Sequence, residues 1–133
     1  MTQLYRQPAD FEATINILST EAGGRINPPF NGIRWDFAYA ADGDTDSLFM
    51  IWPDFFDEAG DSLPTDQPLA IGVDLPARMT VVVDEMREQV HRQRIAVGTT
   101  FYCHEGRKRV AFGTVTRITG LLTERTSPIR SIT

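Results

Sequence analysis

The chain has 133 residues, of which 41% are apolar and 23% charged, and its net charge is −5. This length suits a single domain, and the composition is that of a globular protein rather than a wholly disordered one. No apolar run approaches the length of a membrane-spanning helix, and the first residues lack the apolar stretch of a signal peptide. The single cysteine, Cys103, excludes an intrachain disulfide and fits a reducing compartment. We therefore expect a cytoplasmic protein without a membrane partner.

The charges are unevenly distributed along the chain. From Asp36 to Asp74 there are ten acidic residues and no Lys or Arg, whereas residues 75–133 include ten basic and five acidic ones. Phosphate binding needs local positive charge, so the overall acidity disfavours a general nucleic-acid-binding protein. The basic C-terminal half can still form a basic face, although such blocks are most often solvated surface.

The first half of the chain predicts three strands. In the segment 11–18 apolar and polar residues alternate, which indicates a half-buried strand whose apolar face carries Phe11, Ala13, Ile15 and Ile17. The paired glycines of the segment 21–25 permit positive φ and predict a tight reversal. Alternation resumes in the segment 35–39. The strongly apolar segment 47–52, closed by Pro53, predicts the third strand.

The middle of the chain predicts an acidic surface loop at 55–66, followed by a short strand at 69–73 and a turn at 74–77. The β-branched segment 79–83 predicts a central strand. The segment 84–94 is compatible with one or two helical turns, with Asp84 as cap, Met86 and Val90 on one face, and His91 within a charged stretch.

The clearest predicted hairpin joins a strand at 101–103 to one at 109–118 through a turn at 105–108. One face of its second strand carries Val110, Phe112, Thr114 and Thr116, and the other carries Ala111, Gly113 and Val115.

Many short strands, regular turn signals and no long amphipathic helix predict an all-β fold. We expect a small closed antiparallel Greek-key β-barrel of about six strands. The domain is expected at 11–122 with an acidic insertion near 55–74. An N-terminal tail or edge segment at 1–10 and a flexible C-terminal tail at 123–133 would flank it.

Two segments resemble the C-terminal domain (domain III) of translation elongation factor Tu. The first follows the family order of a strand, a Gly-Gly-Arg turn, a Pro and Phe, a Gly, an Arg and an aromatic strand. It runs without a gap from Phe11 to Tyr39 through Gly23, Gly24, Arg25, Pro28, Phe30, Gly32, Arg34 and Phe37. The second is similar to the last hairpin of that domain, at Ile95, Ala96, Val97, Phe101, Glu105, Gly106, Val110, Gly113 and Val115. The resemblance implies a stand-alone domain III-like barrel, with Phe30 pointing inward and Arg25 and Arg34 on one rim.

In elongation factor Tu this domain contacts the T stem of aminoacyl-tRNA. The resemblance places the corresponding positions at Arg25, Ile26, Asp36, Thr45, Glu105 and Gly106. Arg25, Glu105 and Gly106 match the family, whereas Asp36 replaces a neutral amide and would repel a phosphate. The chain has no GxxxxGK[ST] phosphate loop, so we expect no nucleotide hydrolysis.

Other motifs with known chemistry are incomplete. The segment 42–46 is similar to the start of a calcium loop, but Ser47 and Pro53 stand where an EF-hand needs Gly and Glu. Cys103 and His104 are neighbours that would point to opposite faces of a strand, so they cannot form a nucleophile–base pair. We expect Cys103 to be buried and His104 to be on the surface. We predict no enzyme, no cofactor and no metal site.

We therefore expect a non-catalytic interaction module that binds a protein partner through the barrel rim. The candidate residues are Arg25, Arg34, Trp35, Glu105, Gly106, Arg107 and Lys108. Trp and Arg are enriched in binding hot spots, although a single Trp more often lies in a core. The alternative is a protein that binds tRNA or another structured RNA through the basic residues 107–109. A small barrel enzyme is the third hypothesis, which no motif spacing supports.

Overall fold

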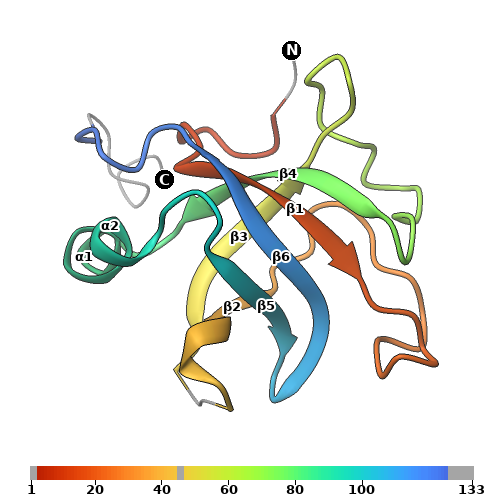
Figure 1. The fold of residues 1–133 in the computed structure, drawn as a ribbon. Coiled ribbons are helices and arrows are strands. Elements are labelled where there is room, and N and C mark those ends of the chain that lie inside the picture. Colours follow the sequence, from red (N-terminus) through yellow and green to blue (C-terminus); the bar gives the residue numbers. More distant parts are fainter. Residues whose placement is uncertain (1–2, 45–46, 126–133) are drawn as a thin grey trace.

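The computed structural model describes residues 3–44 and 47–125 (Figure 1). These residues form six strands: β1 (Phe11–Ile17), β2 (Asp36–Tyr39), β3 (Phe49–Phe55), β4 (Asp74–Val81), β5 (Thr100–Glu105) and β6 (Lys108–Ile118). A short helical segment between β4 and β5 consists of α1 (Asp84–Met86), the π-helical turn η2 (Arg87–His91) and α2 (Arg92–Arg94), and the 3-10 turn η1 (Ala40–Asp42) follows β2. Within the described ranges, every helix is too short or too polar to cross a membrane.

The strands form one closed antiparallel barrel in the order β1-β4-β3-β2-β5-β6, in which β6 pairs again with β1. β2, β3 and β4 are consecutive neighbours, and β5 returns to lie beside β2. This return of a fourth strand to the first of three is the Greek-key arrangement. The predicted closed barrel of about six strands is therefore confirmed. In Figure 1 the helical segment lies at the side of the barrel and the β5–β6 turn at its lower end.

The alternation of β1 places one face inside the barrel, as predicted. Its inward residues are each at most 1% exposed: Phe11, Ala13, Ile15 and Ile17. The ring of Phe37 on β2 stacks on that of Phe101 on β5, with centroids 4.6 Å apart. The same Phe101 ring fills the space beside Gly113 on β6, where an added Cβ would lie 2.6 Å from Phe101 Cε2. Gly113 is therefore required for this aromatic layer.

Three predictions for the middle of the chain are wrong. β3 continues through Pro53 to its end at Phe55. β4 already begins at Asp74, where a turn was predicted, and the strand predicted at 69–73 is not formed. The acidic connection between β3 and β4 therefore spans residues 56–73.

β3 contains Pro53 and β4 contains Pro76. Each strand tolerates its proline because the missing N–H would point to the side of the strand where no neighbouring strand is paired. Pro53 pairs with Met79, whose carbonyl accepts a hydrogen bond from Asp10 on the β1 side. The Pro53 nitrogen therefore faces β2, where the β2–β3 pairing ends at Met50. Pro76 lies one residue beyond the last β3–β4 pair.

The segments predicted as tails pack against the barrel where they are described. Gln7 and Asp10 are 4% and 0% exposed, and the Leu4 N–H donates to Asp54 Oδ2 at 3.0 Å. Near the other end, Arg125 donates to Asp10 Oδ2 at 2.7 Å. The rest of the predicted flexible tail, residues 126–133, lies outside the described part of the chain.

The helical turns predicted at 84–94 are formed, but with a different buried face. Asp84 is the first helical residue rather than the cap, and Val83 occupies the cap position. Arg87 and His91, which are 3% and 1% exposed, are the residues that this segment buries most deeply.

Candidate partner-binding surface

The turn between β5 and β6 presents basic side chains at one end of the barrel. Gly106 and Arg107 separate the paired residues Glu105 and Lys108. Gly106 takes a φ of 61°, a conformation that favours glycine. The tight turn leaves Gly106, Arg107 and Lys108 exposed. Lys108 is the only lysine in the chain.

Glu105 connects this turn to the core and to the loop after β1. Its Oε2 accepts a hydrogen bond from Trp35 Nε1 at 2.8 Å and forms an ion pair with Arg25 Nε at 2.7 Å. Trp35 is 2% exposed and packs edge-on against Phe55, with ring centroids 6.4 Å apart. Trp35 is therefore a core residue that positions Glu105. Three predicted site residues meet here, and Glu105 lies at the same end of the barrel as Gly106 and Lys108.

Arg34 contacts a different group of residues. Its guanidinium lies over the Trp52 ring at 4.3 Å, and Tyr5 packs against the same indole with ring centroids 6.0 Å apart. Burial raises the pKa of the Tyr5 phenol, and the positive charge of Arg34 opposes that shift. Arg25 and Arg34, which were predicted to share a rim, thus have different partners. Arg25 is bound to Glu105, and Arg34 lies over Trp52.

An open groove of about 1010 Å³ lies beside the β5–β6 turn. We call it the basic groove. It is lined by Leu18, Ala22, Gly23, Asp44, Leu48, Tyr102, His104, Gly106, Arg107, Lys108 and Arg109. Three of these residues are basic and one is acidic, while the leucines and the tyrosine add apolar surface. The groove therefore concentrates positive charge in a chain whose net charge is −5.

One wall of the basic groove is held in place by Arg109. Its guanidinium lies over the Tyr102 ring at 4.0 Å and donates to Asp44 Oδ1 at 3.0 Å. Tyr102 in turn packs against Phe112, with ring centroids 5.6 Å apart, and Phe112 is 38% exposed. Because Asp44 is fully exposed, its ion pair adds little to stability. The net positive charge of the groove lining therefore comes from Arg107 and Lys108, because Arg109 and Asp44 oppose each other.

A second hollow of about 250 Å³ adjoins the first. We call it the apolar hollow. Its lining is mostly apolar and comes from the loop after β1 and from the β3–β4 connection: Ile17, Leu18, Ser19, Thr20, Glu21, Arg25, Ile26, Asn27, Pro28, Pro29 and Ile71. Ile26 is 82% exposed and Ile71 is 38% exposed. Leu18 lines both hollows, so they form one continuous surface.

Two predicted side-chain orientations near this surface are wrong. His104 is 7% exposed, because a bulge between Cys103 and His104 changes the β5–β6 register. Its Nδ1 lies 3.3 Å from the Gly106 carbonyl oxygen. Phe30 is 43% exposed, because it bridges to Pro68 outside the barrel. Cys103 is buried as predicted, and burial raises the pKa of its thiol.

Sequence patterns did not reveal a buried ionic cluster near the helical segment. Asp10 Oδ1 accepts from Arg87 Nε, and its Oδ2 accepts from both Arg125 and the Val81 N–H, each at 2.7 Å. Arg125 also donates to Asp84 at 2.6 Å. The five residues belong to three distant parts of the chain, so only the folded barrel brings them together.

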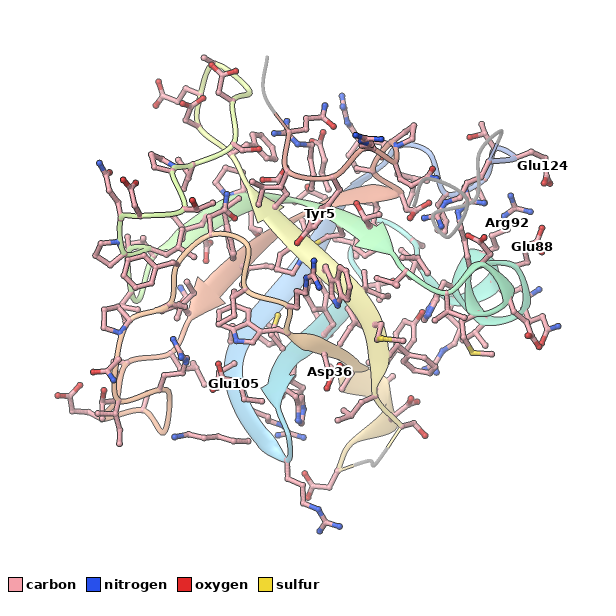
Figure 2. The ribbon with its side chains drawn as sticks, turned by 180° about the vertical axis from the view of Figure 1, so that it is seen from behind. Tyr5, Asp36, Glu88, Arg92, Glu105 and Glu124 are labelled. Carbon is pink, nitrogen blue, oxygen red and sulfur yellow. The ribbon has the colours of Figure 1, made fainter. Side chains whose placement is uncertain are left out.

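Arg92 adds exposed ion pairs to this helical side of the molecule. It lies 4.0 Å from Glu88 and 3.4 Å from Glu124. Figure 2 shows these three residues at one side of the barrel and Glu105 at the opposite side. The ion pairs of Arg92 therefore lie on the opposite side of the barrel from Glu105.

His91, which belongs to a charged stretch of the sequence, lies deep in the structure. It is 1% exposed, and its Nδ1 lies 2.6 Å from the Tyr39 hydroxyl. Burial lowers the pKa of His91 to about 4 and raises that of Tyr39. Arg94 covers the Tyr39 ring at 3.8 Å and pairs with Asp42 at 2.8 Å. His91 is therefore a neutral core residue at pH 7.

The described part of the calcium-like segment forms ion pairs with arginines. Asp42 pairs with Arg94, and Asp44 pairs with Arg109. Residues 45–46 lie outside the described ranges. In residues 3–44 and 47–125, no group of three His, Cys, Asp or Glu side chains is placed to hold a metal ion.

The positions that the resemblance implies for tRNA contact differ in their exposure and in their partners. Arg25 and Glu105 are bound to each other, and Ile26 is highly exposed. Asp36 lies between Met50 and His104 in the sheet. Thr45 lies outside the described residues.

No protein-family model matches this sequence, and a comparison with curated proteins finds no similar one. The likeness to domain III of elongation factor Tu therefore stays a prediction that rests on the residues quoted above. The geometry of the basic groove and the apolar hollow is the basis for assigning a function.

Proposed function

We propose that this barrel is a non-catalytic interaction module, similar to domain III of elongation factor Tu, that binds a protein partner. The observation that carries the proposal is the continuous surface of the basic groove and the apolar hollow. It combines the exposed cations Arg107 and Lys108 with the exposed apolar residues Ile26 and Ile71. Protein interfaces combine apolar and polar surface, and these two hollows provide both.

The residues nearest the groove support a binding role rather than a catalytic one. The Cys103 thiol is 2% exposed, and burial raises its pKa, so it is protonated and enclosed. His104 is 7% exposed and lies against a backbone carbonyl of its own turn. The Cys103 thiol is therefore not placed to attack a bound molecule.

An RNA-binding role is the second candidate. Arg107, Lys108 and Arg109 lie beside Tyr102, and a basic patch with an aromatic ring is a common feature of RNA-binding surfaces. Three features favour the protein partner. Arg25 is paired with Glu105, Asp44 faces the groove, and the adjoining hollow offers apolar surface instead of phosphate-binding groups.

Affinity capture from cell extract tests the proposal. The wild type is compared with Arg107→Glu/Lys108→Glu and with the control Arg117→Glu, whose side chain is 67% exposed on β6 and pairs with Glu12. Extracts are treated with ribonuclease, and recovered proteins are quantified by mass spectrometry. We expect a defined protein that the wild type and the control recover and the groove variant loses.

Two results would count against a protein partner. One is equal recovery of every protein by all three variants. The other is ribonuclease-sensitive recovery together with a gel mobility shift of structured RNA that weakens steeply with salt and depends on Arg107 and Lys108, which would favour RNA.

A further inference from the structure

Building on the interaction role above, we propose that the partner presents one continuous segment with two parts. An acidic stretch binds in the basic groove, and an apolar side chain next to it enters the apolar hollow. The inference names the chemistry of the partner segment. If a protein partner bound elsewhere on the barrel, or bound through a segment without this combination of acids and an apolar side chain, the inference would fail and the proposed function would stand.

The charges of the basic groove favour an acidic segment. Arg107 and Lys108 are exposed at the turn, and Arg109 is held in the groove wall by Tyr102. The acid in the lining, Asp44, is already paired with Arg109. The lining as a whole has three cations and one acid, and this excess of formal positive charge favours carboxylates of a partner.

The apolar hollow favours an apolar side chain beside those acids. Ile26 and Ile71 expose apolar surface there, and Pro28 and Pro29 have no backbone N–H to donate. Arg25 lines the hollow, but its Nε is bound to Glu105 and its Nη1 donates to the Asn27 carbonyl at 3.2 Å. Two of its three guanidinium nitrogens are thus bound within the chain.

Leu18 makes the two hollows one binding surface. The residue lines both of them, and its N–H donates to the Val110 carbonyl at 3.0 Å. The residue is therefore fixed to the barrel where β1 ends. A single extended segment that passes over Leu18 contacts both hollows without a change in the fold.

A nucleic acid fits this combined surface less well. Its phosphates repeat along the whole strand, and each would meet a chain with a net charge of −5. Asp44 lines the basic groove and Glu21 lines the apolar hollow, so each hollow also holds one acid. A peptide can place its carboxylates at the cations alone and an apolar group at Ile26.

The test begins with selection from a random library of displayed twelve-residue peptides on immobilised wild-type protein. Selected peptides are synthesised, and their affinities are measured by fluorescence anisotropy against five proteins. These are the wild type, Arg107→Glu, Ile26→Ser, and the controls Arg117→Glu and Val97→Ser. Val97 is 66% exposed, so it controls for the loss of an exposed apolar side chain. Circular dichroism confirms that each variant is folded.

Carbodiimide coupling gives a second and independent readout. It joins a carboxylate to an amine, with loss of water, when the two groups are in contact. Lys108 is the only lysine of the chain, so a peptide acid bound in the groove is expected to couple to its Nζ. Mass spectrometry locates the new amide bond, and Lys108→Gln removes it.

We expect selected peptides that combine several Asp or Glu residues with a Leu, Ile or Phe. Arg107→Glu and Ile26→Ser should each weaken binding about tenfold, as expected for loss of a central contact, while the two controls bind like the wild type. Peptides that bind in a groove-dependent way but lack acids would overturn the inference and leave the proposed function standing. Absence of any groove-dependent peptide, together with equal capture by the groove variant, would overturn both.

Discussion

Replacing Asp10 by Asn measures how much the buried ionic cluster stabilises the barrel. Asp10 is 0% exposed and accepts three bonds of 2.7 Å, from Arg87, Arg125 and the Val81 N–H. Asn has the same shape but no charge, so two arginines would face a neutral amide in a buried site. Breaking a buried pair by removing one partner costs about 3–5 kcal/mol. Arg125 keeps its bond to Asp84, so we expect a loss of about 3 kcal/mol.

Urea unfolding followed by circular dichroism measures this loss as a change in the free energy of unfolding. The matched control is Glu12→Gln, which removes a carboxylate paired at 3.0 Å with the exposed Arg117. Exposed pairs contribute about 0–1 kcal/mol, so this control should stay close to the wild type. If Asp10→Asn were as stable as Glu12→Gln, the cluster would not stabilise the barrel as argued.

Three further predictions follow from the core. Gly113→Ala should lower the free energy of unfolding by about 2 kcal/mol, because the new Cβ overlaps the Phe101 ring. Urea unfolding should show that Gly113→Ala/Phe101→Leu recovers part of this stability. If Gly113→Ala were as stable as the wild type, the crowding at Phe101 would be contradicted. The folded-state pKa of His91, about 4, lies below its ordinary value of 6.5. As the pH falls, the unfolded chain therefore binds the proton first. The free energy of unfolding should decrease by about 2 kcal/mol between pH 6.5 and pH 4. His91→Gln should lack this part of the pH dependence when its free energy of unfolding is measured across the same range. If the wild type and His91→Gln lost stability in parallel as the pH fell, His91 would not be the group responsible. Cys103 should react with a thiol reagent at least about a hundredfold more slowly in the native protein than in urea, because its thiol is buried and protonated; equal rates contradict its burial.

Most of the barrel could be predicted because its strands follow local rules. The alternation from Phe11 to Ile17 and the hairpin around Gly106 depend on neighbouring residues, and both are confirmed. Proline misled the prediction in β3 and β4, since the effect of a missing N–H depends on whether a neighbouring strand is present. Pro53 and Pro76 lie where one neighbour ends, and the sequence around them does not show this.

Part of the candidate surface was also visible in the sequence, namely the basic turn at Arg107 and Lys108. The role of Trp35 was not, because its bond to Glu105 joins residues far apart in the chain. The apolar hollow was not predicted either. Ile26 and Ile71 come from two loops that meet only when the barrel closes.

The sequence by itself determined the all-β class, the alternating core of β1 and the basic charge of the β5–β6 turn. These depend on side chains a few residues apart, whose directions are set by the two-residue period of a strand. Only the tertiary structure decided that His91 and Asp10 are buried and that Leu18 lines both the basic groove and the apolar hollow. Closure of the barrel brings distant segments together, and the burial of a charged or polar residue depends on which partners it finds there.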